Sequence, residues 1–261
     1  MNKPIRLSYS GLTNYQGCPY CYKLTYIDKV PLEVTSNPAA AFGTSIHDLL
    51  EWWYNDGNFD LRSLLLNFNN FFEKEMNKPE VGKVDKSYKE FLRSRAPTML
   101  RHFYQRQKMD GLLVKPISTE IAFAVPWKDS KGREVLLTGR VDLIIRGEDG
   151  VEIDDYKTAM KLPPDGFIET NHQLTYYSMG YRWLRRQEPE RFKDLENKVV
   201  LHYLQKNVKL ESVRGKKHYM DLLKQVEQTL DGIYGGVFPK KPSVTSCQWC
   251  DYKGIHCDSK F

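Results

Sequence analysis

The stretch of sequence that decides the fold is residues 139–158, which read GRVDLIIRGEDGVEIDDYKT. Two apolar runs flank the turn sequence GEDG at positions 147–150, and this pattern predicts two antiparallel strands joined by a tight turn. Successive side chains of a strand point to opposite faces, so Asp155 and Lys157 share one face and Asp154 takes the other. If the strands pair in this way, Asp142 can approach Asp155 and Lys157 from the neighbouring strand.

Two carboxylates and an ammonium group that meet at the end of a strand indicate metal-assisted hydrolysis of a phosphodiester bond. Carboxylates bind Mg²⁺ or Mn²⁺, and the metal polarises the phosphate and lowers the pKa of a bound water. A lysine beside them orients that water or neutralises developing charge. The alternative is the solvated edge of a hairpin, which is the commoner origin of an acid and a lysine at a strand end.

Hydrophobic periodicity and turn residues predict an α/β fold with a helical insertion before the hairpin, and with the central strands in an antiparallel meander. Ser8 or Ser10 is expected to cap the first helix. The strands are expected at 117–125, 134–145, 151–156 and 199–204. The helices are expected at 8–22, 39–53, 172–183 and 217–233, with two or three more in 61–110.

The composition is that of a globular protein with a substantial core. The chain has 261 residues, of which 41% are hydrophobic and 13% aromatic. No apolar run reaches the roughly 18 residues of a membrane span, so we expect no membrane association. The first residues lack the apolar segment of a signal peptide, and we therefore expect a cytoplasmic protein. The net charge of +6 suits a polyanionic partner such as DNA, although many basic proteins bind no nucleic acid.

Three further groups of residues could belong to the same site. Gly43 allows close backbone approach, and His47, one turn later on a predicted helix, is a possible metal ligand. Gln173 and Tyr177 are four residues apart and share a helix face. Glu120 starts the strand before the hairpin, where it could position the lysine or interact with the residues that ligate the metal. Taken singly, a core histidine, an ordinary amphipathic helix and a surface glutamate explain them as well.

Together these four motifs resemble the RecB-like branch of the PD-(D/E)xK nuclease superfamily. That pattern is Gly-x-x-x-His, Gly-x-x-Asp, Asp-x-Lys-Thr and Gln-x-x-x-Tyr, and the chain shows all four in this order. The resemblance implies a restriction-endonuclease-like core, which is a central mixed sheet flanked by helices. It implies a site for Mg²⁺ or Mn²⁺ made by His47, Asp142, Asp155 and the carbonyl of Tyr156. The implied catalytic set is Lys157, Asp155, Asp142, Glu120, Gln173 and Tyr177.

The five cysteines lie only near the two ends of the chain, at positions 18, 21, 247, 250 and 257. An odd count without a signal peptide argues against a disulfide framework and favours a metal centre that joins the chain ends. The pattern is similar to that of iron–sulfur CRISPR-associated adaptation exonucleases and AddB-type nuclease domains. The resemblance implies a 4Fe-4S cluster bound by Cys18, Cys247, Cys250 and Cys257, and zinc would also suit four thiolates. Cys21 is the alternative to Cys18, and His256 is the alternative to Cys257.

These features predict the following organisation. An iron–sulfur module comprises residues 1–38 and 240–261, and the nuclease core comprises residues 39–239 with the helical insertion at about 55–112. In the family that the chain resembles, such an insertion roofs a channel for single-stranded DNA. Stacking on aromatic side chains would serve that channel, and the alternative is that they form the core. The candidates are Trp52, Trp53, Phe71, Phe72, Phe103 and Tyr104, beside Lys74, Arg93, Arg95, Arg101 and Arg106.

The sequence thus predicts a Mg²⁺- or Mn²⁺-dependent deoxyribonuclease of prokaryotic or phage type. The predicted activity is exonucleolytic hydrolysis of single-stranded DNA or single-stranded tails, in DNA recombination, repair or spacer processing. Partner proteins of a recombination or CRISPR adaptation pathway are possible. Three alternatives remain open: a structure-specific endonuclease of the same superfamily, a non-catalytic DNA-binding subunit, and a zinc-containing enzyme that processes RNA.

Overall fold

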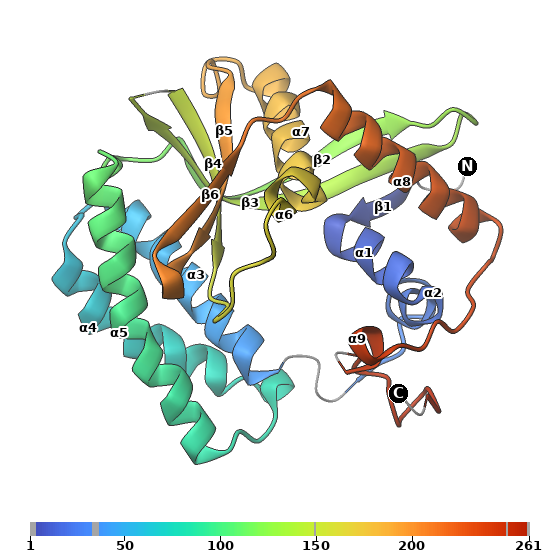
Figure 1. Ribbon diagram of the computed structural model, residues 1–261, viewed down its shortest axis with the longest axis horizontal. Helices are drawn as coiled ribbons and strands as arrows, with labels where there is room; N and C mark the ends of the chain where they lie inside the picture. Colours follow the sequence, from blue (N-terminus) through green and yellow to red (C-terminus); the bar gives the residue numbers. More distant parts are fainter. Residues whose placement is uncertain (1–3, 33–36, 149, 249, 260–261) are drawn as a thin grey trace.

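The computed structural model describes residues 4–32, 37–148, 150–248 and 250–259. A six-stranded mixed sheet lies at its centre with helices on both faces (Figure 1), which confirms the predicted α/β class and the mixed sheet. The strands are β1 (Ile5–Ser8), β2 (Ser118–Lys128), β3 (Glu134–Gly147), β4 (Gly150–Lys157), β5 (Glu196–Tyr203) and β6 (Val208–Ser212).

Strand β3 organises the sheet. One of its edges pairs with antiparallel β2, while the other edge pairs first with parallel β1 and then with antiparallel β4. The sheet continues from β4 to parallel β5 and antiparallel β6. The predicted β3–β4 hairpin is present, with Gly147 opposite Gly150; Asp149 of the predicted turn lies outside the described residues.

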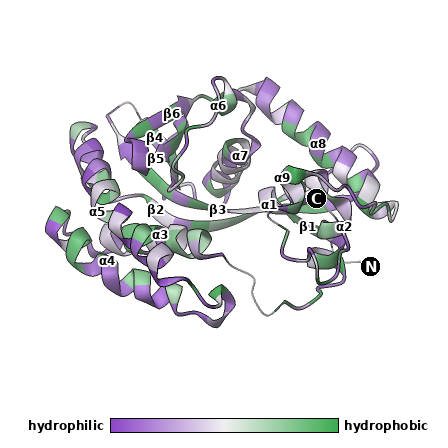
Figure 2. Cartoon of the chain, turned by 60° about the horizontal axis from the view of Figure 1, so that its bottom comes forward, coloured by the Kyte–Doolittle hydropathy of each residue, from purple (hydrophilic) through white to green (hydrophobic). Residues whose placement is uncertain are grey.

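The helices divide between the two faces of the sheet (Figure 1). Helices α3, α4 and α5 build one hydrophobic core with Leu143 and Ile145 of β3. Helices α1, α7 and α8 build the other core with Val141 and Ile144. Figure 2 shows hydrophilic and hydrophobic residues alternating along α4, α5 and α8, as expected of helices with one buried face. The longer helices are α1 (Tyr9–Gly17), α3 (Pro38–Asp56), α4 (Leu61–Met76), α5 (Lys86–Met109), α7 (His172–Gln187) and α8 (Lys216–Tyr234).

Short helices connect or follow these elements, namely α2 (Pro19–Tyr22), α6 (Phe167–Thr170) and α9 (Val244–Cys247). Among the described residues, none of the helices combines the length and the apolar character that crossing a bilayer requires.

The N-terminal region differs from the prediction. The expected helix 8–22 is two helices, because Cys18 is extended with φ −154° and ψ 100°. A residue that precedes proline is driven out of helical geometry, and Pro19 then begins α2. Of the two residues predicted as the cap of the first helix, Ser8 caps α1. Its Oγ accepts a hydrogen bond from Gly11 N at 3.0 Å. Strands β1 and β6 were not predicted.

The core alternative holds for three of the six aromatic residues named for a DNA channel. Trp53, Phe72 and Phe103 are completely buried between α3, α4 and α5. Trp52, Phe71 and Tyr104 are partly buried and pack against the same core, and their part in DNA binding remains a prediction. Their spacing on amphipathic helices places them on the inward faces, where burial of aromatic surface stabilises the helical layer.

The two ends of the chain lie side by side, with α1 and α2 next to α9 (Figure 1). Tyr20 N donates a hydrogen bond to Pro239 O at 3.2 Å, and Lys241 N contacts Cys18 Sγ at 3.5 Å. The division of the chain into an iron–sulfur module and a nuclease core remains a prediction.

Candidate active site

The candidate site lies where strands β3 and β4 separate. Their ladder ends at the pair Leu143–Asp154, whereas β5 continues to pair with the other edge of β4 as far as Lys157. The backbone N–H of Tyr156 donates instead to the side chain of Asp142, whose Oδ2 lies 2.9 Å away. The fork between the strands thus leaves room for a carboxylate where a strand partner would otherwise lie.

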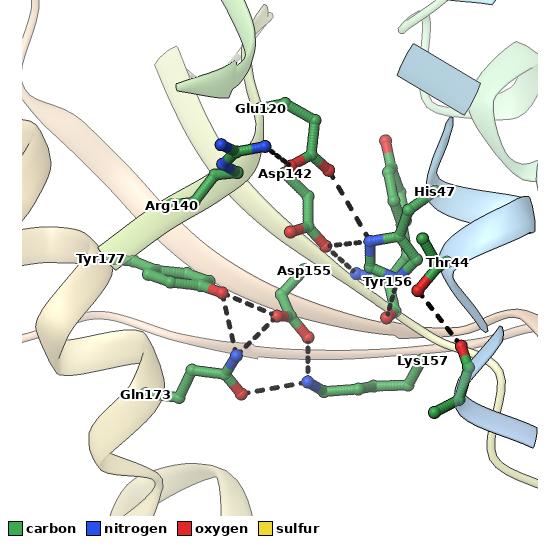
Figure 3. A network of polar contacts seen from close by, with 11 residues as sticks. Thr44, His47, Glu120, Arg140, Asp142, Asp155, Tyr156, Lys157, Gln173 and Tyr177 are labelled. Carbon is green, nitrogen blue, oxygen red and sulfur yellow. Dashed lines mark hydrogen bonds and ion pairs between the residues drawn. The ribbon is translucent and has the colours of Figure 1, made fainter. Parts of the chain in front are cut away.

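Helix α3 places His47 over this fork (Figure 3). Its Nε2 lies 3.0 Å from the carbonyl oxygen of Tyr156, and its Nδ1 lies 3.2 Å from Asp142 Oδ2. Without a metal these two contacts suit a protonated imidazole, and metal binding would require loss of a ring proton. Burial alone would lower the pKa of His47, but the surrounding carboxylates, Asp142 first, raise it to about 9.

Glu120 completes this side of the site. Its Oε1 is 3.8 Å from His47 Nδ1, and ligand atoms of His47, Glu120 and Asp142 all lie within 4.8 Å of one another. Glu120 has φ +43°, in the left-handed region that side chains other than glycine rarely adopt, at a cost of about 1–3 kcal/mol. The β2–β3 ladder is interrupted here, between the pairs of Thr119 and Ile121. This strained backbone turns the glutamate towards His47 and Asp142 rather than towards the lysine.

The second half of the site is a network around Asp155. Lys157 Nζ lies 2.5 Å from Asp155 Oδ2 and donates to Gln173 Oε1 at 3.0 Å. Gln173 Nε2 donates to Asp155 Oδ1 at 2.9 Å, and the Tyr177 hydroxyl donates to the same oxygen at 3.1 Å. Helix α7 therefore holds both the carboxylate and the ammonium (Figure 3).

The packing of α7 on the sheet depends on two glycines. Gly139 belongs to one of the sequence motifs, and Gly180 does not. The ring of Phe123 lies between Gly139 of β3 and Gly180 of α7. A Cβ atom at Gly139 would lie 2.5 Å from the ring, and one at Gly180 would lie 2.4 Å from it. Gly180 and Phe123 thus set the distance of α7 from the sheet, and with it the reach of Gln173. Neither role could be predicted from the sequence motifs.

The electrostatics of the site favour a bound cation. Burial raises the pKa of Asp142 to about 7, and the neighbouring carboxylates of Asp155 and Glu120 add to that rise. Burial would lower the pKa of Lys157, yet the pairing with Asp155 raises it. Buried carboxylates are stabilised by a cation, and a set of carboxylate oxygens, one imidazole and a backbone carbonyl fits Mg²⁺ or Mn²⁺. The predicted ligands Asp142, His47 and Tyr156 converge as required, with Glu120 beside them and Asp155 paired to the lysine.

The five cysteines lie together at the joined ends of the chain. All of them line one cavity of about 190 Å³ between α2 and the C-terminal segment. Cys21 Sγ and Cys250 Sγ are 3.7 Å apart, and Cys18 borders the same cavity next to Lys241. The predicted cysteine ligands thus lie around one space, and a metal centre there remains a prediction. Cys18 and Cys21 both remain candidates for the fourth ligand.

The chain is similar to a known protein family over most of its length. A sequence model of the PD-(D/E)XK nuclease superfamily matches residues 6–257. The mixed sheet flanked by helices is consistent with the restriction-endonuclease-like core of that superfamily. A solved structure titled "Crystal structure of SSO0001" is similar, with 12% identity and a TM-score of 0.45, over 100% of this chain and 90% of its own. No curated protein matches the chain.

Proposed function

The chain belongs to the PD-(D/E)XK nuclease superfamily, and from this premise we propose that it is a Mg²⁺- or Mn²⁺-dependent deoxyribonuclease. The observation that carries the proposal is the convergence of His47, Glu120 and Asp142 within 4.8 Å, next to the Asp155–Lys157 pair. We also place the chain in the RecB-like branch, on the strength of its His47 and of its Gln173–Tyr177 helix.

Each residue has a distinct part in the proposed reaction. His47, Asp142, Asp155 and the Tyr156 carbonyl would hold the metal, with Glu120 beside them. A metal held there would supply polarisation of the phosphate and a lower pKa for a water molecule. Lys157 places its positive charge where negative charge develops on the phosphate and the attacking oxygen. Gln173 and Tyr177 fix the positions of Lys157 and Asp155 through the hydrogen bonds described above.

We propose exonucleolytic action on single-stranded DNA or single-stranded tails, in recombination, repair or spacer processing with partner proteins of such a pathway. The net charge of +6 suits a polyanionic substrate. A structure-specific endonuclease is the second candidate, because the same active site would cut within a strand. A non-catalytic subunit is disfavoured, since every group that hydrolysis needs is present in the site.

The test compares linear end-labelled single-stranded DNA with circular single-stranded DNA, each with Mn²⁺ or with EDTA. Lys157→Ala is the active-site variant, and Lys161→Ala, an exposed lysine four residues further on, is its control. Metal-dependent loss of linear DNA alone, abolished only by Lys157→Ala, supports an exonuclease. Cutting of the circle supports the endonuclease. A folded protein that cuts neither supports the non-catalytic alternative, and preference for RNA contradicts the proposed substrate.

We further propose that Cys18, Cys247, Cys250 and Cys257 bind a 4Fe-4S cluster that ties the chain ends together. The shared cavity of the five thiols supports this, and a ligated centre would restrain the unfolded chain. Iron, sulfide and zinc would be measured in protein purified without oxygen. Iron and sulfide in equal amounts support the cluster, and zinc alone contradicts it. Loss of iron from Cys18→Ala but not from Cys21→Ala would identify Cys18 as the fourth ligand, and the reverse would identify Cys21.

A further inference from the structure

A groove next to the proposed catalytic lysine has an unusual lining. It has a volume of about 490 Å³, and it is bordered by Lys157, by the segment that follows it, and by the first turns of α5. Two aromatic residues of α5 face it while remaining open to solvent: Tyr88 is 40% exposed and Phe91 is 44% exposed. The other aromatic residues of α5, Phe103 and Tyr104, pack in the core, so this exposed pair is not part of the helical packing.

The two exposed rings already form a stack. Their centroids are 6.0 Å apart and their planes are inclined by only 20°. The Arg95 guanidinium lies one turn further along α5, 5.9 Å from the centre of the Phe91 ring. We refer to Tyr88 and Phe91 together as the aromatic platform. A flat, exposed aromatic surface of this kind offers its face to another planar ring.

The aromatic platform is fixed relative to the candidate active site. Arg95 donates from Nη2 to the carbonyl oxygen of Thr158 at 2.6 Å, and Thr158 directly follows Lys157. Arg95 Nε also donates to Gln205 Oε1 at 3.0 Å. The first turns of α5 and the end of β4 are therefore joined, so a group that stacks on the platform takes a defined position relative to Lys157.

The charge of the groove indicates the kind of occupant. Among the described residues that line it, Lys157 and Arg95 are cationic and none is acidic. Aromatic rings beside cationic side chains are the combination that binds unpaired nucleotides. The rings stack on the bases, and the cations attract the phosphates of the nucleic-acid backbone. A volume of about 490 Å³ lies within the range of pockets for small ligands, roughly 300–1,000 Å³.

We propose that the aromatic platform binds an unpaired base of the strand being cut, next to the phosphate at Lys157. This rests on the proposed nuclease function, and it gives that function a preference for single-stranded substrate. A base within a duplex is stacked on its neighbours and cannot place its face against the platform.

The test separates base recognition from hydrolysis. The variant Tyr88→Leu/Phe91→Leu removes both rings but keeps apolar, helix-forming side chains. Tyr234→Leu is the matched control, because Tyr234 is a similarly exposed aromatic residue, 49%, at the end of α8. Substrates are a single-stranded oligonucleotide and the same oligonucleotide without bases near its labelled end. The platform variant should lower kcat/KM for the intact strand by about tenfold or more, in line with base stacking on aromatic side chains.

The strand without bases should be cut equally by the wild type and the platform variant. An equal loss on both substrates, or no loss on either, would overturn the proposal. Binding is read independently of cleavage, with EDTA present, from the fluorescence of 2-aminopurine in the oligonucleotide. Quenching by the wild type and by Tyr234→Leu, but not by the platform variant, supports stacking even if no cleavage is seen. Equal quenching by all three proteins refutes it.

Discussion

His202 should make the protein sensitive to acid, and replacing it should remove part of that sensitivity. It lies in β5, opposite Tyr156 of β4 and Lys209 of β6. The ring is completely buried, and within the described part of the chain neither of its nitrogens has a hydrogen-bond partner. Burial lowers the pKa of His202 from 6.5 to about 3, and the nearby positive groups of Lys209, Arg106 and His102 add to that effect.

The sign of the pH dependence follows from this lowered pKa. The unfolded chain binds a proton at His202 below about pH 6.5, whereas the folded chain does not until about pH 3. The stability contributed by the neutral ring is therefore complete above pH 6.5 and is lost as the pH falls towards 3. At about pH 5 the loss from this one residue is about 2 kcal/mol, from 1.36 kcal/mol for each pH unit below the pKa of the unfolded chain.

His202→Leu removes the titrating ring and keeps the site apolar. The free energy of unfolding would be measured by urea denaturation at about pH 7.5 and about pH 5. The wild type should lose about 2 kcal/mol more than the variant between these two conditions. Buried acids such as Asp142 titrate in both proteins, so their effect cancels in the difference. His218→Gln, at the surface beside Glu169, is the control and should keep the acid sensitivity of the wild type. Equal pH dependence of wild type and His202→Leu would refute the reasoning.

Four other substitutions test the site and its support. Lys157→Gln should lower the cleavage rate at least about a hundredfold with unchanged circular dichroism, because the charge beside the phosphate is lost. Asp142→Asn should weaken Mn²⁺ binding in calorimetry, since a carboxylate within the cation site becomes neutral; unchanged affinity would contradict this ligand. Gly180→Ala should lower the free energy of unfolding by about 1–3 kcal/mol in urea titrations and reduce the cleavage rate, because the added Cβ collides with Phe123. Asp129→Ala should cost about 1–3 kcal/mol in the same titrations while the activity per folded molecule stays unchanged, since Asp129 accepts hydrogen bonds from Lys131 and Arg133 in the β2–β3 turn.

Local patterns in the sequence determined the hairpin, most helices and the identity of the chemical groups. The alternation in residues 139–158 depends only on the two-residue period of a strand, so the separation of Asp155 from Asp154 could be predicted without a fold. The cap at Ser8 and the extended residue before Pro19 are also local effects, although the break at Cys18 was not recognised. The order of the four motifs was sufficient to indicate the nuclease superfamily.

The tertiary structure alone decided how these groups meet. Strand β1 is four residues long and β6 is five, too short for a clear pattern. The partner of β1, strand β3, also lies far away in the sequence. The fork that gives Asp142 its place exists because β3 pairs with β1 and β4 along a single edge. The left-handed Glu120 lies at an interruption of the β2–β3 ladder on the other edge. Three of the aromatic residues named for a DNA-facing role, Trp53, Phe72 and Phe103, are completely buried, whereas Tyr88 and Phe91 are exposed. Amphipathic periodicity does not reveal which side of a helix the rest of the chain will cover.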